Sequence, residues 1–178
     1  MSRPQAAIAL TFLLSLTAAG CGSPTISSDA ENQAPAAETA VSAETTAAEN
    51  PDFAVVTAVT ATAQNSEAYT FAVTIESPDT GCEQYANWWE VVSEEGELLY
   101  RRILAHSHVD EQPFERSGGP VAIASDQTVI VRAHMYPTGY GTQAMEGNPD
   151  SGFQSTTLAA DFATALADAD PQPNDCTF

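Results

Sequence analysis

The stretch YTFAVTIES, residues 69–77, alternates apolar and polar side chains along most of its length. In an extended chain successive side chains point to opposite faces, so its aromatic and aliphatic residues gather on one face. This alternation predicts a β-strand with one face packed in a core and the other face more polar. The segment SPDTG, residues 77–81, follows and ends the strand with residues typical of turns.

Strand patterns recur through the middle of the chain, and no helical period appears between Phe53 and Met145. Further strands are expected at residues 54–63, 83–92, 97–105, 120–124 and 128–136. Turns are expected at SEEG (93–96, with Gly96 in the left-handed position), RSGGP (116–120) and PTGYG (137–141). Strand signals about eight to twelve residues apart predict an antiparallel β-sandwich of immunoglobulin or fibronectin type. A partly closed barrel is the alternative.

A helical spacing appears near the C-terminus, in STTLAADFATALADAD, residues 155–170. Its apolar residues recur as on one face of a helix, and they are Leu158, Phe162, Ala165, Leu166 and Ala169. Ser155 or a following threonine could cap this helix, and Pro171 would end it. We therefore expect a β-sandwich domain at residues 52–178 that carries a short C-terminal helix.

The chain begins with MSRPQAAIALTFLLSLTAAG, residues 1–20, in which an apolar run follows the single charge of Arg3. This is the composition of a secretory signal peptide, and the run is too short to span a membrane as a helix. The junction TAAGC, which ends at Cys21, resembles the lipobox of bacterial lipoprotein precursors. The resemblance implies cleavage before Cys21, a diacylglycerol on its thiol, and a stable anchor of several acyl chains. A plain signal peptide before a chance cysteine is the alternative.

The segment that follows, up to residue 51, is rich in Ala, Ser, Thr, Glu and Pro and has no aromatic residue. Such a composition buries too little apolar surface to offset the entropy of ordering, so residues 21–51 are expected to form the lipidated cysteine and a flexible acidic tether. A helix through AAETAVSAETTAAE is the competing interpretation. By the same resemblance, Gly22 in place of aspartate implies the outer membrane of a two-membrane bacterium.

The chain has 24 acidic residues against 5 arginines, with no lysine, and a formal net charge of −19. A strongly acidic surface repels nucleic acid and anionic lipid, so no nucleic acid is expected as a partner. It favours cationic partners or metal ions and also suits a salty habitat. The simplest interpretation is a solvated surface without a specific partner.

Two cysteines remain besides Cys21, namely Cys82 and Cys176. An exported chain with one such pair is expected to form one disulfide. The bridge would tie the C-terminal tail to the first third of the domain and contribute roughly 4–5 kcal/mol in the chain-entropy model. The spacing of the cysteines does not match a thiolate metal site.

Trp88 and Trp89 stand side by side in a predicted strand, so one indole is expected in the core and the other on the opposite face. The outward indole, or Tyr140 in the loop PTGYGTQ, could stack on a sugar or anchor a partner. The alternative is that the outward indole lies under a covering element such as the C-terminal helix. No phosphate-binding glycine motif and no nucleophile elbow is present, so no catalytic residue is predicted.

Two of the three histidines form the motif His106-x-His108, with Asp110 two residues further on. These side chains share one face of an extended chain, and His134 could add a third imidazole to a zinc or copper site. In a sandwich, however, the tryptophan strand separates the strand that leads to His106 from the strand that carries His134, a span of roughly 10 Å. We therefore favour HSHVDEQPF as a polar strand end, ordered by hydrogen bonds of its imidazoles and by flanking arginines that pair with its acids.

Together these features predict a non-enzymatic, acidic lipoprotein of the cell envelope. It would be a binding module attached to the membrane through its lipid anchor, with an envelope protein or a glycan as partner and no cofactor. The alternative is a zinc- or copper-binding protein, or a small metalloenzyme, that uses His106, His108 and His134.

Overall fold

The computed structural model describes residues 52–177. The predicted signal peptide (residues 1–20), the lipidation site Cys21 and the tether up to residue 51 lie outside the described residues. Within the described part of the chain, no helix is long and apolar enough to cross a membrane.

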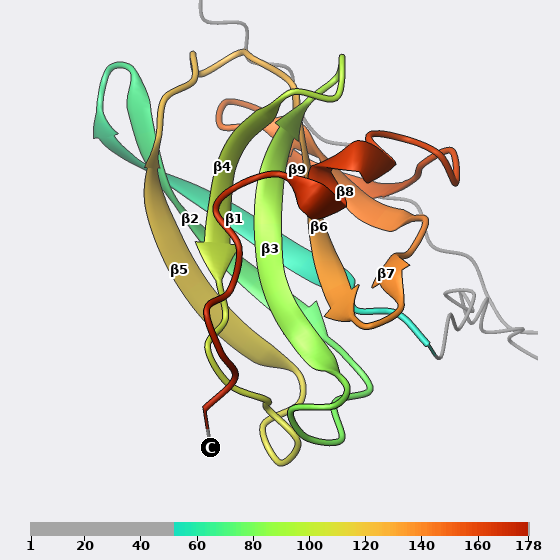
Figure 1. The fold of residues 1–178 in the computed structure, drawn as a ribbon. Coiled ribbons are helices and arrows are strands. Elements are labelled where there is room, and N and C mark those ends of the chain that lie inside the picture. Colours follow the sequence, from blue (N-terminus) through green and yellow to red (C-terminus); the bar gives the residue numbers. More distant parts are fainter. Residues whose placement is uncertain (1–51, 178) are drawn as a thin grey trace, which may run out of the picture. The chain divides into compact units, whose positions relative to one another are not determined.

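The domain is built from two antiparallel sheets (Figure 1). One sheet has the strand order β1-β2-β5, and the other has the order β4-β3-β6-β8-β9 with the short β7 beside β6. The strands are β1 Val55–Asn65, β2 Ala68–Glu76, β3 Tyr85–Ser93, β4 Leu98–Ile103, β5 Phe114–Val121, β6 Val129–Tyr136, β7 Gly139–Tyr140, β8 Gln143–Asn148 and β9 Gly152–Thr157. The predicted all-β class with antiparallel sheets is confirmed, while the immunoglobulin or fibronectin type stays a prediction.

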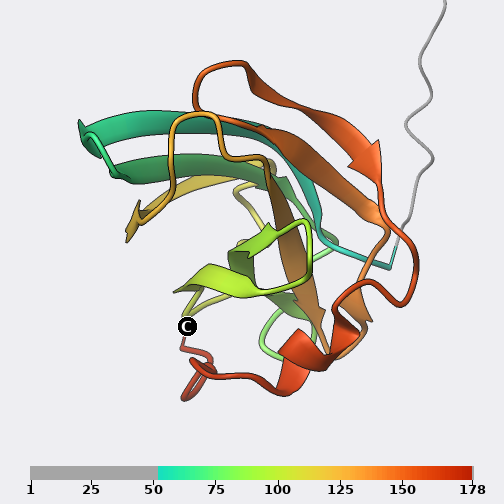
Figure 2. The same cartoon turned by 90° about the horizontal axis from the view of Figure 1, so that it is seen from above.

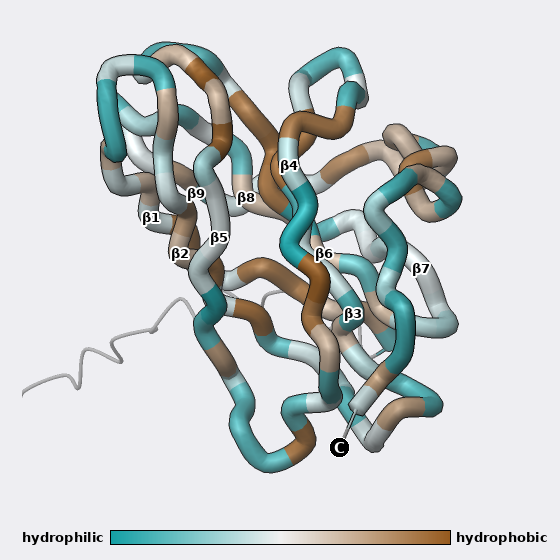
Figure 3. Tube along the Cα trace, turned by 60° about the vertical axis from the view of Figure 1, so that its left-hand side comes forward, coloured by the Kyte–Doolittle hydropathy of each residue, from teal (hydrophilic) through white to brown (hydrophobic). Residues whose placement is uncertain are grey.

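The hydrophobic core draws on both sheets, which Figure 2 shows from above. The alternating residues of β2 that begin at Tyr69 and end at Ile75 are at most 7% exposed, as the pattern in residues 69–77 predicts. The second sheet adds Trp89, Val91, Val129, Val131, Ala133 and Met135. Burial of each large side chain stabilises the fold by about 1.5–3 kcal/mol. In Figure 3 the connections between strands are largely hydrophilic.

The segment RSGGP, residues 116–120, lies within strand β5 and does not form the predicted turn. Gly118 pairs with Phe71 of β2 in the ladder. A Cβ at Gly118 would lie 2.6 Å from Tyr100 Oη and 2.9 Å from Trp89 Cζ2. The glycine therefore allows side chains of the other sheet to approach the β5 backbone closely, and it does not mark a chain reversal.

The predicted hairpin turn at residues 93–96 is confirmed. The Gly96 N–H donates to Ser93 O at 3.0 Å, and Gly96 has a φ of 86°, in the left-handed region. The hairpin places β4 beside β3, whose other neighbour is β6. The tryptophan strand thus separates β4 from the strand that carries His134, as predicted.

The predicted helix at residues 155–170 does not form. Its first residues belong to β9, which pairs with β8, and a single 3₁₀ turn, η1 Thr164–Asp168, follows later. The chain enters η1 through Ala163, whose φ of 44° is left-handed and interrupts any right-handed helix. Residues 158–177, here named the C-terminal strap, run across the second sheet (red in Figure 1).

A disulfide joins Cys82 to Cys176 across 94 residues of sequence, in agreement with the prediction from the cysteine count. Beside it, the Thr177 N–H donates to Ala105 O at 2.7 Å. The end of the C-terminal strap is therefore tied to the rest of the domain by one covalent bond and one backbone hydrogen bond.

Candidate functional site

Three charged side chains form a buried centre on the outer face of the second sheet. In β3, Trp89 points into the core, so Glu90 points to the opposite face. Glu90 lies directly across from Arg101 of β4 and from Arg132 of β6. Its carboxylate accepts hydrogen bonds from Arg101 at 2.7 and 2.9 Å and from Arg132 at 2.9 Å. All three side chains are at most 2% exposed.

The two guanidinium groups of this centre also bind the backbone of the C-terminal strap. The acceptors are the carbonyl oxygens of Phe162 and Ala163 for Arg132, and those of Leu166, Ala169 and Pro171 for Arg101. In an α-helix most of these carbonyls would accept from amides four residues later. Here arginine donors from distant strands bind all five, and only Ala163 O and Leu166 O also accept from amides three residues later, so these bonds stabilise the irregular path of the strap in place of the predicted helix.

Aromatic rings enclose the buried centre. The guanidinium carbon of Arg101 lies 4.3 Å from the centroid of the Trp88 ring, and that of Arg132 lies 3.6 Å from the centroid of Tyr140. The His134 ring stacks on Trp88 with centroids 3.9 Å apart. Trp88 is only 2% exposed. The outward indole, a candidate for ligand binding in the sequence, is therefore covered, and half-buried Tyr140 packs against an arginine.

The titratable rings of this centre do not change charge near neutral pH. Burial, together with the adjacent guanidinium groups, lowers the pKa of His134 to about 4. His134 Nδ1 lies 2.7 Å from Asn87 Oδ1, and because an amide oxygen can only accept, the neutral imidazole carries its proton on Nδ1. Burial also raises the pKa of Tyr140 to about 12. Since neither ring is poised for proton transfer at neutral pH, the centre is suited to holding the strap on the sheet.

The His106-x-His108 motif lies elsewhere, in the connection between β4 and β5. His108 is 3% exposed and stacks on Phe114 with centroids 3.8 Å apart. Its backbone N–H donates to Asp79 Oδ2 at 2.8 Å, whereas neither ring nitrogen has a hydrogen-bond partner within residues 52–177. Burial is the main cause that lowers the pKa of His108. His106 is exposed, with its ring centroid 4.5 Å from that of His108.

Asp79, which the sequence analysis did not single out, organises this loop. Its Oδ1 accepts from Ser77 Oγ at 2.7 Å and from the Ala86 N–H at 2.9 Å. The loop is thus ordered by a buried carboxylate and by ring stacking, and not by imidazole hydrogen bonds as predicted. Of the predicted arginine pairs, Arg116 with Glu111 forms at the surface. The available signal was the position of Asp79 in the turn SPDTG, where aspartate side chains commonly bind nearby amides.

The three histidines considered as zinc or copper ligands are not brought together. His134 packs on Trp88, while His108 lies near Asp79 and Phe114 with the His106 ring beside it. Among residues 52–177, no group of three or more His, Cys, Asp or Glu is arranged to hold a metal ion.

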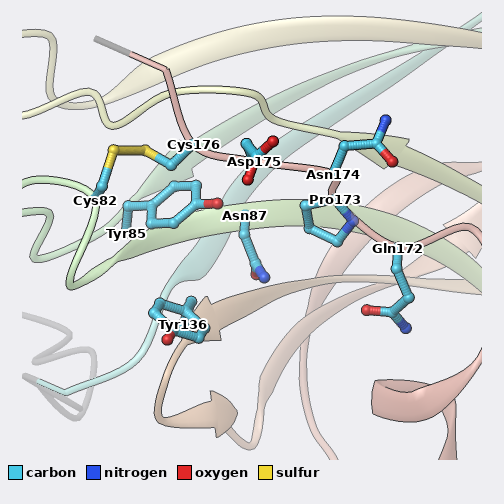
Figure 4. Close-up of a pocket in the computed structure, with 9 residues that line it drawn as sticks. All are labelled: Cys82, Tyr85, Asn87, Tyr136, Gln172, Pro173, Asn174, Asp175 and Cys176. Carbon is cyan, nitrogen blue, oxygen red and sulfur yellow. A yellow bond between two sulfur atoms is a disulfide. The ribbon is translucent and has the colours of Figure 1, made fainter.

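A shallow pocket of about 350 Å³ opens beside the disulfide (Figure 4). Its lining consists of Cys82, Tyr85, Asn87, Tyr136, Gln172, Pro173, Asn174, Asp175 and Cys176. The rings of Tyr85 and Tyr136 have centroids 6.1 Å apart, because these residues pair across β3 and β6. Tyr136 is 46% exposed. The sequence alone does not predict this site, since the pocket needs the strap to return beside the ends of two strands.

Comparison with known proteins shows a similarity to a protein named as a lipoprotein. No family model and no solved structure matches the chain. A protein of Halomicrobium mukohataei, named "Putative lipoprotein", is 40% identical over 85 residues, which are 48% of this chain and 42% of that protein. The chain therefore spans less than half the length of the relative that it matches.

Proposed function

We propose that this chain is a membrane-anchored lipoprotein of the cell envelope whose folded domain is a non-enzymatic binding module. The observation that carries the proposal is the junction TAAGC at Cys21, which resembles a lipobox. The similarity to a protein named as a lipoprotein supports it independently. In this proposal residues 21–51 act as a tether that lets the domain reach a partner away from the membrane surface.

The binding role is supported by how the domain uses its polar groups. The buried charges hold the strap in place, and the buried histidines are neutral at neutral pH, as their lowered pKa values indicate. Within residues 52–177 no serine, threonine or cysteine side chain is hydrogen-bonded to a histidine ring. Aromatic and amide side chains line the pocket beside the disulfide, among them Tyr136, which is 46% exposed. These features suit the binding of a partner better than the catalysis of a reaction.

The acidic composition supports an exposed position in a salty medium. The whole chain has 24 acidic residues against 5 arginines, and this excess of negative charge favours solubility and repels anionic head groups. The relative comes from a halophilic archaeon. The outer-membrane expectation applies to a two-membrane bacterium, so we propose the cell envelope without assigning a particular membrane.

Anchoring is tested by expressing the wild-type chain, Cys21→Ser and the double variant Cys82→Ser with Cys176→Ser in a prokaryotic host that lipidates proteins. We expect the wild type and the double variant to sediment with membranes and to incorporate labelled lipid. Cys21→Ser should appear in the soluble or secreted fraction without label. A Cys21→Ser chain that sediments with membranes as the wild type does would overturn the anchor.

A further inference from the structure

The floor of the pocket beside the disulfide carries a fixed hydrogen-bond donor. Asn87 is 4% exposed, and its Oδ1 bonds to His134 Nδ1 at 2.7 Å. This bond orients the amide, which lines the pocket (Figure 4). Within residues 52–177 the Asn87 Nδ2 group has no hydrogen-bond partner, and it is not among the atoms sealed from solvent. An oriented, unpartnered donor on a buried side chain is a feature that a ligand acceptor would satisfy.

Two tyrosine rings form the aromatic part of the same pocket. Tyr85 is 4% exposed and Tyr136 is 46% exposed, with an angle of 57° between their ring planes. Burial raises the pKa of Tyr85, so its hydroxyl stays protonated. The pocket thus offers one fixed ring and one ring open to contact from solvent.

The wall opposite the tyrosines comes from the end of the C-terminal strap. The side chains of Asn174 and Asp175 make no hydrogen bond within the described residues, whereas Gln172 Nε2 is bound to Ala167 O and Ala169 O. The neighbouring disulfide at Cys176 holds this wall beside β3. The free amide and carboxylate add donors and acceptors around the opening.

We propose that this pocket binds a neutral sugar residue of a glycan, which deepens the proposed binding function. One face of a sugar ring is apolar and packs on an exposed tyrosine ring, while its hydroxyl groups pair with amides and a carboxylate. A volume of about 350 Å³ is enough for one sugar residue. The net charge of −19 disfavours acidic sugars and phosphate esters. A cation site is less well matched, because Asp175 is the one carboxylate among the described residues that line the pocket, and the two rings do not form a cage.

The test is saturation-transfer NMR on the full-length chain in a detergent without a sugar head group. The probes are glucose, mannose, galactose and N-acetylglucosamine at millimolar concentration, with tetramethylammonium as the competing cation. We expect saturation of ring protons of at least one sugar by the wild type. Tyr136→Ala should weaken binding about tenfold. Tyr136→Phe should retain binding because it keeps the aromatic face.

Two further variants separate recognition from folding. Asn87→Asp keeps the acceptor for His134 and removes the floor donor, so it should weaken sugar binding several-fold while the chain stays folded. Val109→Ala, at a residue that is also 46% exposed but outside the pocket, should bind as the wild type does. The proposal fails if no sugar gives a signal, if Tyr136→Ala binds like the wild type, or if only tetramethylammonium binds. None of these outcomes depends on whether Cys21 is lipidated.

Discussion

Two arginine–glutamate pairs in this domain have the same N–O separation of 2.7 Å and opposite surroundings. In the pair of Arg101 with Glu90 both side chains are 0% exposed, and in the pair of Arg116 with Glu111 they are 27% and 60% exposed. The first carboxylate sits between two guanidinium groups that also bind strap carbonyls. The second pair lies at the surface and joins Glu111, in the connection before β5, to Arg116 in β5.

The contrast shows that distance alone does not measure the importance of an ion pair. A surface pair contributes little, because water and salt screen it and two long side chains must be held in place. A buried pair matters mainly when one partner is removed, since the remaining charge then lies in a medium that solvates it poorly. The same comparison of buried with exposed groups applies to the histidines, of which His108 and His134 are buried and His106 is exposed.

The largest effect is expected for Glu90→Gln. Two buried guanidinium groups would lose their counter-charge, and the free energy of unfolding should fall by about 4 kcal/mol. The strap should also become more open to proteolysis, because Arg101 and Arg132 hold it. Urea unfolding measures the first effect and limited proteolysis the second. The matched control, Glu111→Gln, should have a free energy of unfolding close to that of the wild type. Equal losses in both variants would show that burial does not distinguish the two ion pairs.

The disulfide holds the same strap covalently, so its removal tests how much of the strap the arginine contacts keep in place by themselves. The double variant Cys82→Ser with Cys176→Ser should lose roughly 3 kcal/mol of unfolding free energy, below the roughly 4–5 kcal/mol of the chain-entropy model because unfolded chains retain some structure. We expect hydrogen exchange to rise first at residues 172–177, with residues 162–169 still protected by the arginines. Uniform loss of protection along the whole strap would show that the disulfide, and not the arginine contacts, holds it.

His134 should make stability depend on pH. Its pKa falls from the ordinary value of 6.5 to about 4 in the folded state, so the unfolded chain binds more protons between these values. The free energy of unfolding therefore decreases as pH is lowered through that window, by up to about 3 kcal/mol from this group. Urea unfolding from pH 7 to pH 4 should show a smaller decrease for His134→Gln. The exposed control His106→Gln should follow the wild-type profile, and a steep profile retained in His134→Gln would assign the effect to other groups.

The smallest difference is expected between the two histidines of the loop. His108→Ala removes a ring stacked on Phe114 and should cost about 1 kcal/mol, because loss of two unpaired nitrogens offsets part of the lost packing. His106→Ala should change stability by less than about 0.5 kcal/mol.

Calorimetry with zinc and copper at neutral pH should show no submicromolar binding by the wild type. Stoichiometric binding that disappears in both variants would restore the metal-binding alternative.

Local patterns in the sequence were enough to predict much of the framework. The alternation in residues 69–77 placed β2 and its buried face, because the period of a strand is a local property. The hairpin turn at Gly96 and the pairing of Cys82 with Cys176 likewise needed only turn chemistry and a count of cysteines. The prediction that a strand lies between β4 and His134 followed from the expected topology.

The candidate site was less predictable, because it depends on residues that meet only in the fold. Tyr85 and Tyr136 face each other across two strands, and the strap closes the pocket from the far end of the chain. Trp88 and Tyr140 looked like binding residues because the sequence does not show what covers them. The structure buries Trp88 and packs Tyr140 against Arg132.

By itself, then, the sequence determined the strand periodicity, the acidic balance, the cysteine pair and the lipobox-like junction at Cys21. Tertiary structure decided which polar groups became partners. The spacing in residues 155–170 suits a helix, but Arg101 and Arg132 supply donors to its carbonyls from distant strands. The glycines at 118 and 119 suit a turn, but side chains of the opposite sheet approach Gly118 and the backbone of β2 approaches Gly119, so both positions take glycine within a strand. In both cases long-range contacts outweighed a local preference, because each buried polar group must find a partner and each core space must be filled.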